Sequence, residues 1–289
     1  MKNSILSLIL IVVFFSCTKK DMVLPDNLQN NTSSFDQPVA RLNNQEKIKL
    51  FKAWSSVGYV YAGYYSKRKN IYAEVANLGY NKKVYVHHKM ADDTWMDFEL
   101  KYIKAADNNT EIWGWENDYS GYTSSPNNNF GNQFVLKYEV NGQTYWDNNA
   151  GLNYSMGLSD GMYLQTGLNV SVDTYASYFS NYGNATSSSF NVVADIRNIA
   201  YNKIVTVVYT SNNWQTVQTA PLNFAQYYSI GNGVSLISPN VFGTERWIAN
   251  INLNSMIKNI EYAVSYKVNG IEYWDNNFGN NYKVTLKNY

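Results

Sequence analysis

The chain has 289 residues and is poor in cysteine, histidine and charge. It contains one Cys and two His, charged residues make up 16% of it, and its formal net charge is +1. One Cys cannot form an internal disulfide, and Cys/His metal sites need more ligands than these. A net charge near zero excludes a basic nucleic-acid-binding surface as the main theme. We therefore expect no metal, no cofactor and no nucleic-acid partner.

Long hydrophobic runs are also scarce, and the clearest one lies at the N-terminus. Residues 5–15 are apolar apart from one serine and follow Lys2. This run is too short to span a bilayer and has the length of a signal-peptide core. It ends at Ser16 and Cys17, and a small residue before a lone Cys resembles a bacterial lipoprotein cleavage site. We expect residues 1–16 to be a lipoprotein signal peptide, although a plain secretory peptide is the alternative.

The expected lipid anchor on Cys17 would hold the chain at a membrane, because acyl chains gain about 0.8 kcal/mol per buried CH₂. The predicted location is the cell envelope, on the periplasmic or the cell-surface face of an outer membrane. Residues 17–45 are rich in Asn, Gln, Ser, Asp and Pro and have no hydrophobic period. Such a composition is typical of a flexible tether.

The rest of the chain contains one pattern written twice. The 17 residues from Tyr138 match the 17 residues from Tyr266 at 12 positions. Upstream, residues 77–86 pair with residues 198–207 in the same order, and a tryptophan follows each of them. Self-similarity at a fixed spacing indicates repeated structural units. The sequence therefore predicts two tandem domains, at 46–156 and 168–289, each large enough for its own core.

Each repeat has the signals of short antiparallel strands. Apolar residues alternate with polar ones, and an Asn-Gly pair stands at 141–142 and again at 269–270. Asn-Gly between apolar runs predicts a two-residue hairpin, because both residues tolerate positive φ. Residues 44–54 could pass for a helix, but they align with the strand-like segment 170–175. We therefore predict an all-β chain of two tandem antiparallel β-sandwiches.

The residues kept in both repeats are mostly polar and aromatic, on turns and strand ends where binding residues tend to lie. A Trp or Tyr ring offers a flat face to the C–H side of a sugar, and Asn amides can pair with adjacent hydroxyls. The pattern predicts carbohydrate binding. The candidates in the first repeat are Tyr80, Lys82, Trp95, Trp146, Asn148 and Asn149. Those in the second repeat are Tyr201, Lys203, Trp214, Trp274, Asn276 and Asn277.

Some repeated residues have a structural interpretation instead. Trp113 and Trp247 are core candidates, and Tyr138 and Tyr266 alternate with aliphatic residues and are expected to be buried. The aspartate of each Tyr–Trp–Asp–Asn–Asn motif is expected to hold a turn through its own side chain. For the two candidate lysines, ligand contact and simple solvation both stay open.

The Asn–x–x–Tyr–Asn–Lys block, the following Trp and the Tyr–Trp–Asp–Asn–Asn block resemble carbohydrate-binding module family 21. The resemblance covers both repeats and implies immunoglobulin-like β-sandwiches that bind α-1,4-glucan without cutting it. It implies one site per repeat that pairs the loop Trp with the Trp of the tail motif: Trp95 with Trp146, and Trp214 with Trp274. A second site would centre on Tyr80 and on Tyr201, and the motif asparagines would bond glucose hydroxyls. Val135 and Ala263 stand where one family member has a further Tyr.

Enzyme signals are few, since no nucleotide loop, nucleophile elbow or metalloprotease motif is present. The first hypothesis is a non-catalytic lipoprotein that holds starch, glycogen or maltooligosaccharide for polysaccharide utilisation, with glycan-degrading enzymes on other chains. The second is a surface interaction lipoprotein that binds a protein or another polysaccharide, with its aromatics as hot spots. A glycosidase with an unrecognised pair of carboxylates is the third.

Overall fold

A computed structural model describes residues 42, 46–61, 63–122, 130–181, 187–231, 234–254 and 256–288. Within these residues the chain forms 23 strands and no helix, as the alternating pattern predicted. The predicted signal peptide 1–16, the lipidation site Cys17 and the tether 17–45, apart from Leu42, lie outside the described residues.

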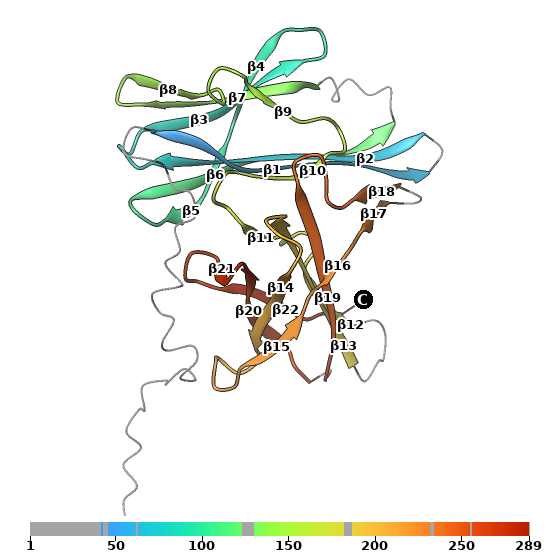
Figure 1. Cartoon of the computed structure of the whole chain (residues 1–289). Coiled ribbons are helices and arrows are strands. Elements are labelled where there is room, and N and C mark those ends of the chain that lie inside the picture. The colour runs from blue at the N-terminus through green and yellow to red at the C-terminus, as the bar shows by residue number, and fades with distance from the viewer. Residues whose placement is uncertain are drawn as a thin grey trace, which may run out of the picture.

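Two sheets pack face to face in the first half of the chain, which we name the first sandwich (Figure 1). One sheet has the order β10-β1-β2-β6-β5, and the other has the order β4-β3-β7-β8 with β9 beside β7. Their strands are β1 (Ile48–Tyr61), β2 (Tyr64–Ala76), β3 (Lys82–Met90), β4 (Trp95–Glu99), β5 (Lys101–Ala106), β6 (Thr110–Tyr122), β7 (Phe130–Val140), β8 (Gln143–Asp147), β9 (Tyr154–Ser155) and β10 (Gly161–Leu164).

The second half repeats this arrangement as the second sandwich. One sheet has the order β16-β19-β13-β12-β23 with β11 beside β13, the other has the order β15-β14-β20-β21 with β22 beside β20, and β17 and β18 form a separate hairpin. The bounds are β11 (Val170–Val172), β12 (Tyr178–Asn181), β13 (Ser187–Arg197), β14 (Lys203–Thr210), β15 (Gln218–Pro221), β16 (Asn223–Phe224), β17 (Tyr227–Gly231), β18 (Val234–Ile237), β19 (Thr244–Asn254), β20 (Asn259–Val268), β21 (Ile271–Asp275), β22 (Tyr282–Thr285) and β23 (Lys287–Asn288).

The two Asn-Gly hairpins form as predicted. Asn141 and Gly142 have φ of 53° and 73° between β7 and β8, and the equivalent pair between β20 and β21 has φ of 50° and 77°. These left-handed values suit the twist of a tight hairpin. Each hairpin therefore fixes the register of the strand that carries the tryptophan of the Tyr–Trp–Asp–Asn–Asn motif, which is β8 in the first sandwich and β21 in the second.

Each sandwich has its own hydrophobic core, made by the alternate residues of each strand that lie on the inner face of its sheet. Val84, Val86 and His88 of β3 point inward and are buried, whereas the residues between them lie on the outer face. Tyr138 and Tyr266 are fully buried, as predicted, and their hydroxyls donate 2.8 Å hydrogen bonds to the carbonyls of Ala76 and Arg197. The buried polar end of each tyrosine is thereby satisfied.

The segment that could pass for a helix is strand β1, and its predicted alignment with β11 is confirmed. The backbone N–H of Leu50 donates to Asp147 Oδ2 at 2.7 Å, and that of Val172 donates to Asp275 Oδ2 at 2.7 Å. The motif aspartate also accepts a bond from the hydroxyl of the tyrosine seven residues later in each half. The backbone N–H two residues later also donates to each aspartate, at 3.2 Å, so the predicted turn-holding role of both is confirmed.

A third apolar cluster lies where the two sandwiches meet, beneath the β1-β2-β6 layer (Figure 1). It joins Phe51 and Trp54 of β1 with Met162 and Leu164 of β10 and with residues of the β17–β18 hairpin. The sequence analysis predicted no such cluster, and residues 157–167 lie outside both predicted domains. In the structure that segment supplies β10, which pairs with β1.

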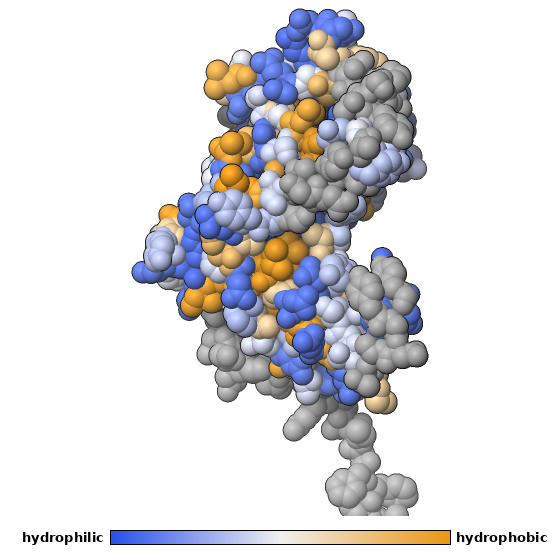
Figure 2. Space-filling view, turned by 90° about the vertical axis from the view of Figure 1, so that its right-hand side faces the viewer, coloured by the Kyte–Doolittle hydropathy of each residue, from blue (hydrophilic) through white to orange (hydrophobic). Residues whose placement is uncertain are grey.

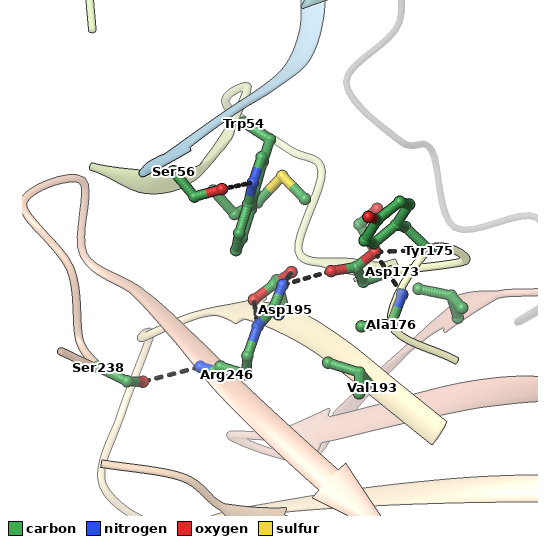
Figure 3. A network of polar contacts seen from close by, with 12 residues as sticks. Trp54, Ser56, Asp173, Tyr175, Ala176, Val193, Asp195, Ser238 and Arg246 are labelled. Carbon is green, nitrogen blue, oxygen red and sulfur yellow. Dashed lines mark hydrogen bonds and ion pairs between the residues drawn. The ribbon is translucent and has the colours of Figure 1, made fainter. Parts of the chain in front are cut away.

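A buried network of charged and aromatic groups extends this junction (Figure 3). Arg246 of β19 donates to both oxygens of Asp195, at 2.9 and 2.7 Å, and to Asp173 at 2.7 Å. Its guanidinium packs against the rings of Trp54 and Tyr228, 4.4 and 4.5 Å from their centroids. A bidentate, stacked arginine of this kind joins elements rigidly. Trp54 belongs to the first sandwich, so this contact ties the two halves together.

The charges of this network set the protonation of Asp173. Burial opposes its ionisation, but the positive charges of Arg246 and Arg68 outweigh that effect and hold the pKa of Asp173 below its usual value. Arg68 itself reaches from the first sandwich to the ring of Tyr175, 3.6 Å from the centroid.

The side of the molecule in Figure 2 carries hydrophobic residues in separate clusters among hydrophilic ones.

Candidate functional site

Three rings form an aromatic platform on the outer face of the β4-β3-β7-β8 sheet. His87 of β3 stacks on Trp95 of β4, with ring centroids 5.1 Å apart and planes 13° from parallel. Trp146 of β8 stands edge-on to His87, with centroids 5.5 Å apart and planes at 78°. The predicted pair Trp95 and Trp146 therefore meets through a histidine. We call these three residues the platform.

The platform borders an open depression of about 350 Å³. Val135, Asn148 and Asn153 also line it. Trp146 is 51% exposed, which is unusual for a tryptophan on a strand. Solvent-facing rings with amide groups beside them match the chemistry expected for sugar binding.

Hydrogen bonds and charges hold the platform in place from its edge. His87 Nδ1 lies 2.6 Å from Asp97 Oδ1, and Lys137 bonds the other oxygen of Asp97. Burial opposes ionisation of Asp97, but the bonds from Lys137 and His87 hold the pKa of its carboxyl below the usual value. The ammonium of Lys137 also lies 5.9 Å from the centroid of the Trp146 ring. The ring orientations are thus set before any ligand arrives.

The loop after Trp146 explains why the motif is rich in asparagine. Asn149, Ala150, Gly151 and Asn153 all have positive φ, a region that Asn and Gly enter more readily than other residues. Asn149 Nδ2 donates to the carbonyl of Asn153 at 3.0 Å, and Asn148 Oδ1 accepts from the Gly151 N–H at 3.0 Å. Both asparagines therefore hold the loop and are exposed, and Asn148 also borders the depression.

Lys82 and Lys203 lie in buried ion pairs, which differs from both interpretations that the sequence left open. Lys82 Nζ donates to Asn77 Oδ1 at 2.5 Å and to both oxygens of Glu111 at 2.9 Å. Lys203 makes the same contacts with Asn198 and Glu245. The side chains of the two lysines are only 6% and 4% exposed. All three ammonium hydrogens are thereby used, so we place neither lysine in the candidate site.

The same ion pairs position the two predicted core tryptophans. Trp113 Nε1 donates to Glu111 at 2.9 Å, and Trp247 Nε1 donates to Glu245 at 3.0 Å. Both tryptophans are partly buried and pack against the cores of their sandwiches. The repeated Asn–Lys–Glu–Trp unit is thus a framework of each half.

Tyr80 and Tyr201 are almost fully exposed, at 98% and 96%. Each lies in the turn between two strands, and a hollow of about 530 Å³ lies beside the first of these turns. Asn141 holds that turn against the Asn-Gly hairpin by donating to the carbonyl of Leu78 at 2.9 Å. A bare tyrosine ring on a fixed turn is suited to stacking, and its role as a second contact stays a prediction.

The second tryptophan pair is arranged differently from the first. Glu99 pairs with Tyr85 and Pro221 with Thr206, so the strand position equivalent to Trp95 is Val217. Trp214 lies three residues earlier, in a turn at φ 65°, and its Nε1 donates to Glu261 at 2.8 Å. Val208 stands at the position of His87. The second half therefore has no counterpart of the ring that joins the first pair.

Trp274 and the asparagines beside it face the first sandwich. They line a cleft between the two halves, together with residues of β1, β2, β5 and β6. Asn277 accepts a bond from Lys104, and the ring of Phe278 lies 6.0 Å from that of Phe51. Trp274 and Asn276 are half-buried there, whereas Trp146 and Asn148 are exposed. The two repeats thus present the same motif to different surroundings.

His87 was not among the predicted site residues. Its duplicate is Val208, so a search restricted to residues kept in both repeats passes over it. The alternation of β3 was the available signal, because it places His87 outward while His88 faces the core.

No helix in the described part of the chain is long and apolar enough to span a membrane. No group of three or more His, Cys, Asp or Glu side chains in the same residues is arranged to hold a metal ion.

Comparison with known proteins gives one family. The sequence model of the carbohydrate/starch-binding module family 21 matches residues 67–157 and 181–285. Each segment contains one complete tail motif. The two matches together span more than half of the chain.

Individual relatives match over shorter stretches. Glucoamylase 1 of Rhizopus oryzae is 36% identical over 85 residues, which cover 29% of this chain and 13% of the relative. Protein phosphatase 1 regulatory subunit 3B of Rattus norvegicus is 27% identical over 90 residues, which cover 31% of this chain and 29% of the relative. This chain thus spans less than a third of the length of either relative.

Among solved structures, the starch-binding domain of Rhizopus oryzae glucoamylase, in complex with β-cyclodextrin and maltoheptaose, is similar to this chain. The match is 25% identical with a TM-score of 0.29, and covers 41% of this chain and 99% of that domain.

Proposed function

The chain belongs to the carbohydrate/starch-binding module family 21, and from this premise we propose that it binds α-1,4-glucan without cleaving it. The observation that carries the proposal is the platform of Trp95, His87 and Trp146 on an exposed sheet face. Both matched segments are binding-module sequence, so most of the described chain is assigned to binding. The site lies in the first sandwich.

The ring angles favour a curved chain over a flat one. The stacked rings of Trp95 and His87 share one plane direction, whereas Trp146 stands at 78° to His87. An α-1,4-linked glucan turns along its length, so successive sugar rings can meet faces that differ in direction. A β-1,4-linked chain is a flat ribbon and would require coplanar rings. Asn148 and the rim of the depression would pair with hydroxyls of the same sugars.

We also propose that the protein acts at the cell envelope, anchored by a lipid on Cys17. Only the signal-like N-terminal sequence supports this part. An anchored binder would hold starch, glycogen or maltooligosaccharide close to enzymes on other chains. Weak sites suffice for such retention, because dissociation constants of about 0.1–1 mM correspond to roughly 4–5.5 kcal/mol each and a polymer engages several sites at once.

The test is a pull-down of the purified full chain on insoluble starch, with cellulose as the control polymer. We expect retention on starch, release by soluble maltooligosaccharide, and loss of retention in the Trp95→Ala/Trp146→Ala variant. Tyr227→Ala is the matched control, because this tyrosine is 62% exposed and lies away from the platform. Release of reducing sugar from starch would contradict the non-catalytic part.

The outcomes separate the function from the site. Starch retention that survives the double substitution would keep glucan binding and refute the platform. A folded chain that ignores starch and maltooligosaccharide would refute glucan binding. Binding to another polysaccharide, or to a protein, would then take its place.

A further inference from the structure

The cleft between the two sandwiches has the size of a small-molecule site. Its volume is about 550 Å³, within the roughly 300–1,000 Å³ of typical ligand pockets, which often lie at domain junctions. One wall comes from the first sandwich, through residues of β1, β2, β5 and β6. The other wall is the tail motif of the second sandwich. The cleft is thus lined by both repeats.

The wall from the first sandwich carries hydrogen-bonding groups on an aromatic base. The Tyr72 hydroxyl donates to Glu116 Oε1 at 2.6 Å. Lys52 Nζ lies 5.3 Å from the centroid of the Tyr72 ring and donates to Ser171 Oγ at 2.9 Å. A carboxylate accepts at two oxygens and an ammonium donates three hydrogens, so Glu116 and Lys52 have capacity beyond these contacts. This wall can bond hydroxyl groups as donor and as acceptor.

The wall from the second sandwich supplies the ring and the amide that the motif uses elsewhere. Lys104 bonds Asn277, and its ammonium lies 4.4 Å from the centroid of the Phe278 ring. The corresponding position in the first repeat is Ala150, which makes no such contact among the described residues. Phe278, Trp274 and Asn276 line the same cleft, opposite residues of the first sandwich. The second motif therefore faces a wall where the first motif faces solvent.

We propose that this cleft is a separate glucan site, which takes a short α-1,4-linked oligosaccharide or the end of a longer chain. The proposal rests on the proposed function and assigns new roles to residues outside the motifs. Trp274 supplies the ring face, Asn276 the amide, and Glu116 and Lys52 bond hydroxyls from the opposite side. Because the cleft has two walls, it excludes the surface of a granule. The open platform and the enclosed cleft thus take different forms of one polymer.

The experiment removes the platform first, so that the cleft is measured alone. The full chain carrying Trp95→Ala/Trp146→Ala is titrated with maltotriose by calorimetry. Thr174→Trp then places a bulky ring at the exposed rim of the cleft, and Glu116→Gln removes the carboxylate charge with little change in shape. The matched controls are Thr219→Trp and Glu99→Gln, both at exposed strand positions that do not line the cleft.

We expect the platform-free chain to keep one maltotriose site. Thr174→Trp and Glu116→Gln should each weaken it at least tenfold, whereas the two controls should leave it unchanged. Thermal melting of each variant checks that it is folded, and Thr174→Trp keeps the test valid if Glu116→Gln disturbs the wall.

Three results would overturn the proposal. The first is a platform-free chain without any maltotriose binding, which would leave the platform as the sole glucan site. The second is a remaining site that neither Thr174→Trp nor Glu116→Gln affects, since the binding would then lie elsewhere, for example at Tyr80. The third is failure of the unaltered chain to bind starch or maltotriose, which refutes the proposed function as well and is seen before any substitution is made.

Discussion

Replacement of His88 by phenylalanine tests the clearest electrostatic feature of the first core. This side chain is fully buried on the inner face of β3, between the rings of Phe130 and Phe134. Burial lowers the pKa of His88 to about 3, and the nearby charge of Lys69 acts in the same direction. The bond between Nδ1 and the Lys89 carbonyl only partly opposes these effects. The ring is therefore neutral in the folded protein.

The sign and size of the effect follow from linkage. The unfolded chain binds a proton at this histidine below a pKa of about 6.5, whereas the folded chain does not until about pH 3, so acid favours unfolding. Between pH 7 and pH 5 this difference removes about 2 kcal/mol from the free energy of unfolding. Carboxyl groups contribute little in this range, because their unfolded pKa values lie near 4.

Urea unfolding of the wild-type chain and of His88→Phe, at pH 7 and at pH 5, measures the difference. We expect the wild type to lose about 2 kcal/mol more than the variant between these two values. Phe134→Leu is the control: it destabilises the same core without changing a titratable group, so its pH dependence should equal that of the wild type. If His88→Phe keeps the full pH dependence, the inference of a buried neutral histidine is wrong.

Three further predictions concern the framework and the platform. Arg246→Ala leaves two buried carboxylates without their partner, so the free energy of unfolding in urea should fall by about 3–5 kcal/mol; a loss below 1 kcal/mol would contradict the described network. Lys82→Met should lower stability by about 3 kcal/mol yet leave the glucan affinity of the folded chain unchanged, and a selective loss of affinity would return this lysine to the site. His87→Ala should weaken maltooligosaccharide binding about threefold to tenfold in calorimetry, because it removes the ring between the two tryptophans, and an unchanged affinity would exclude a contact.

Much of the fold could be predicted because it is encoded locally and twice. Asn-Gly predicts a hairpin by its own backbone preference, and alternation places Tyr138 and Tyr266 inside by the geometry of a strand. The second repeat then supports each local prediction independently. The alignment of residues 48–50 with 170–172, for instance, settles strand over helix for β1.

The junction could not be predicted, because its residues have no common sequence pattern. Asp173, Asp195 and Arg246 lie far apart in the chain, and only the folded second sandwich brings them together. Each reads as an ordinary surface charge when its neighbours in the sequence are considered. The register of Trp214 was hidden for a related reason, since counting residues between motifs ignores where a strand begins.

The framework lysines carried a signal that the sequence interpretation overlooked. Glu111 precedes Trp113 by two residues, as Glu245 precedes Trp247, so both repeats contain Glu–x–Trp. Both repeats thus keep a glutamate and a lysine beside core positions, and this pattern indicates an ion pair. Without this acid as a partner, the motif lysines would be available to a ligand.

Because Arg246 packs against both Trp54 and Tyr228, the two repeats are difficult to separate and recombine with other proteins. A cut between the repeats would leave the first part with an uncovered apolar face around Phe51 and Trp54, and would remove one of the two rings that cover the guanidinium in the second part. Neither repeat can therefore be moved into another protein without losing contacts that it makes at the junction. To use one repeat alone, an engineer would first have to replace the apolar residues on the side that faces the other repeat.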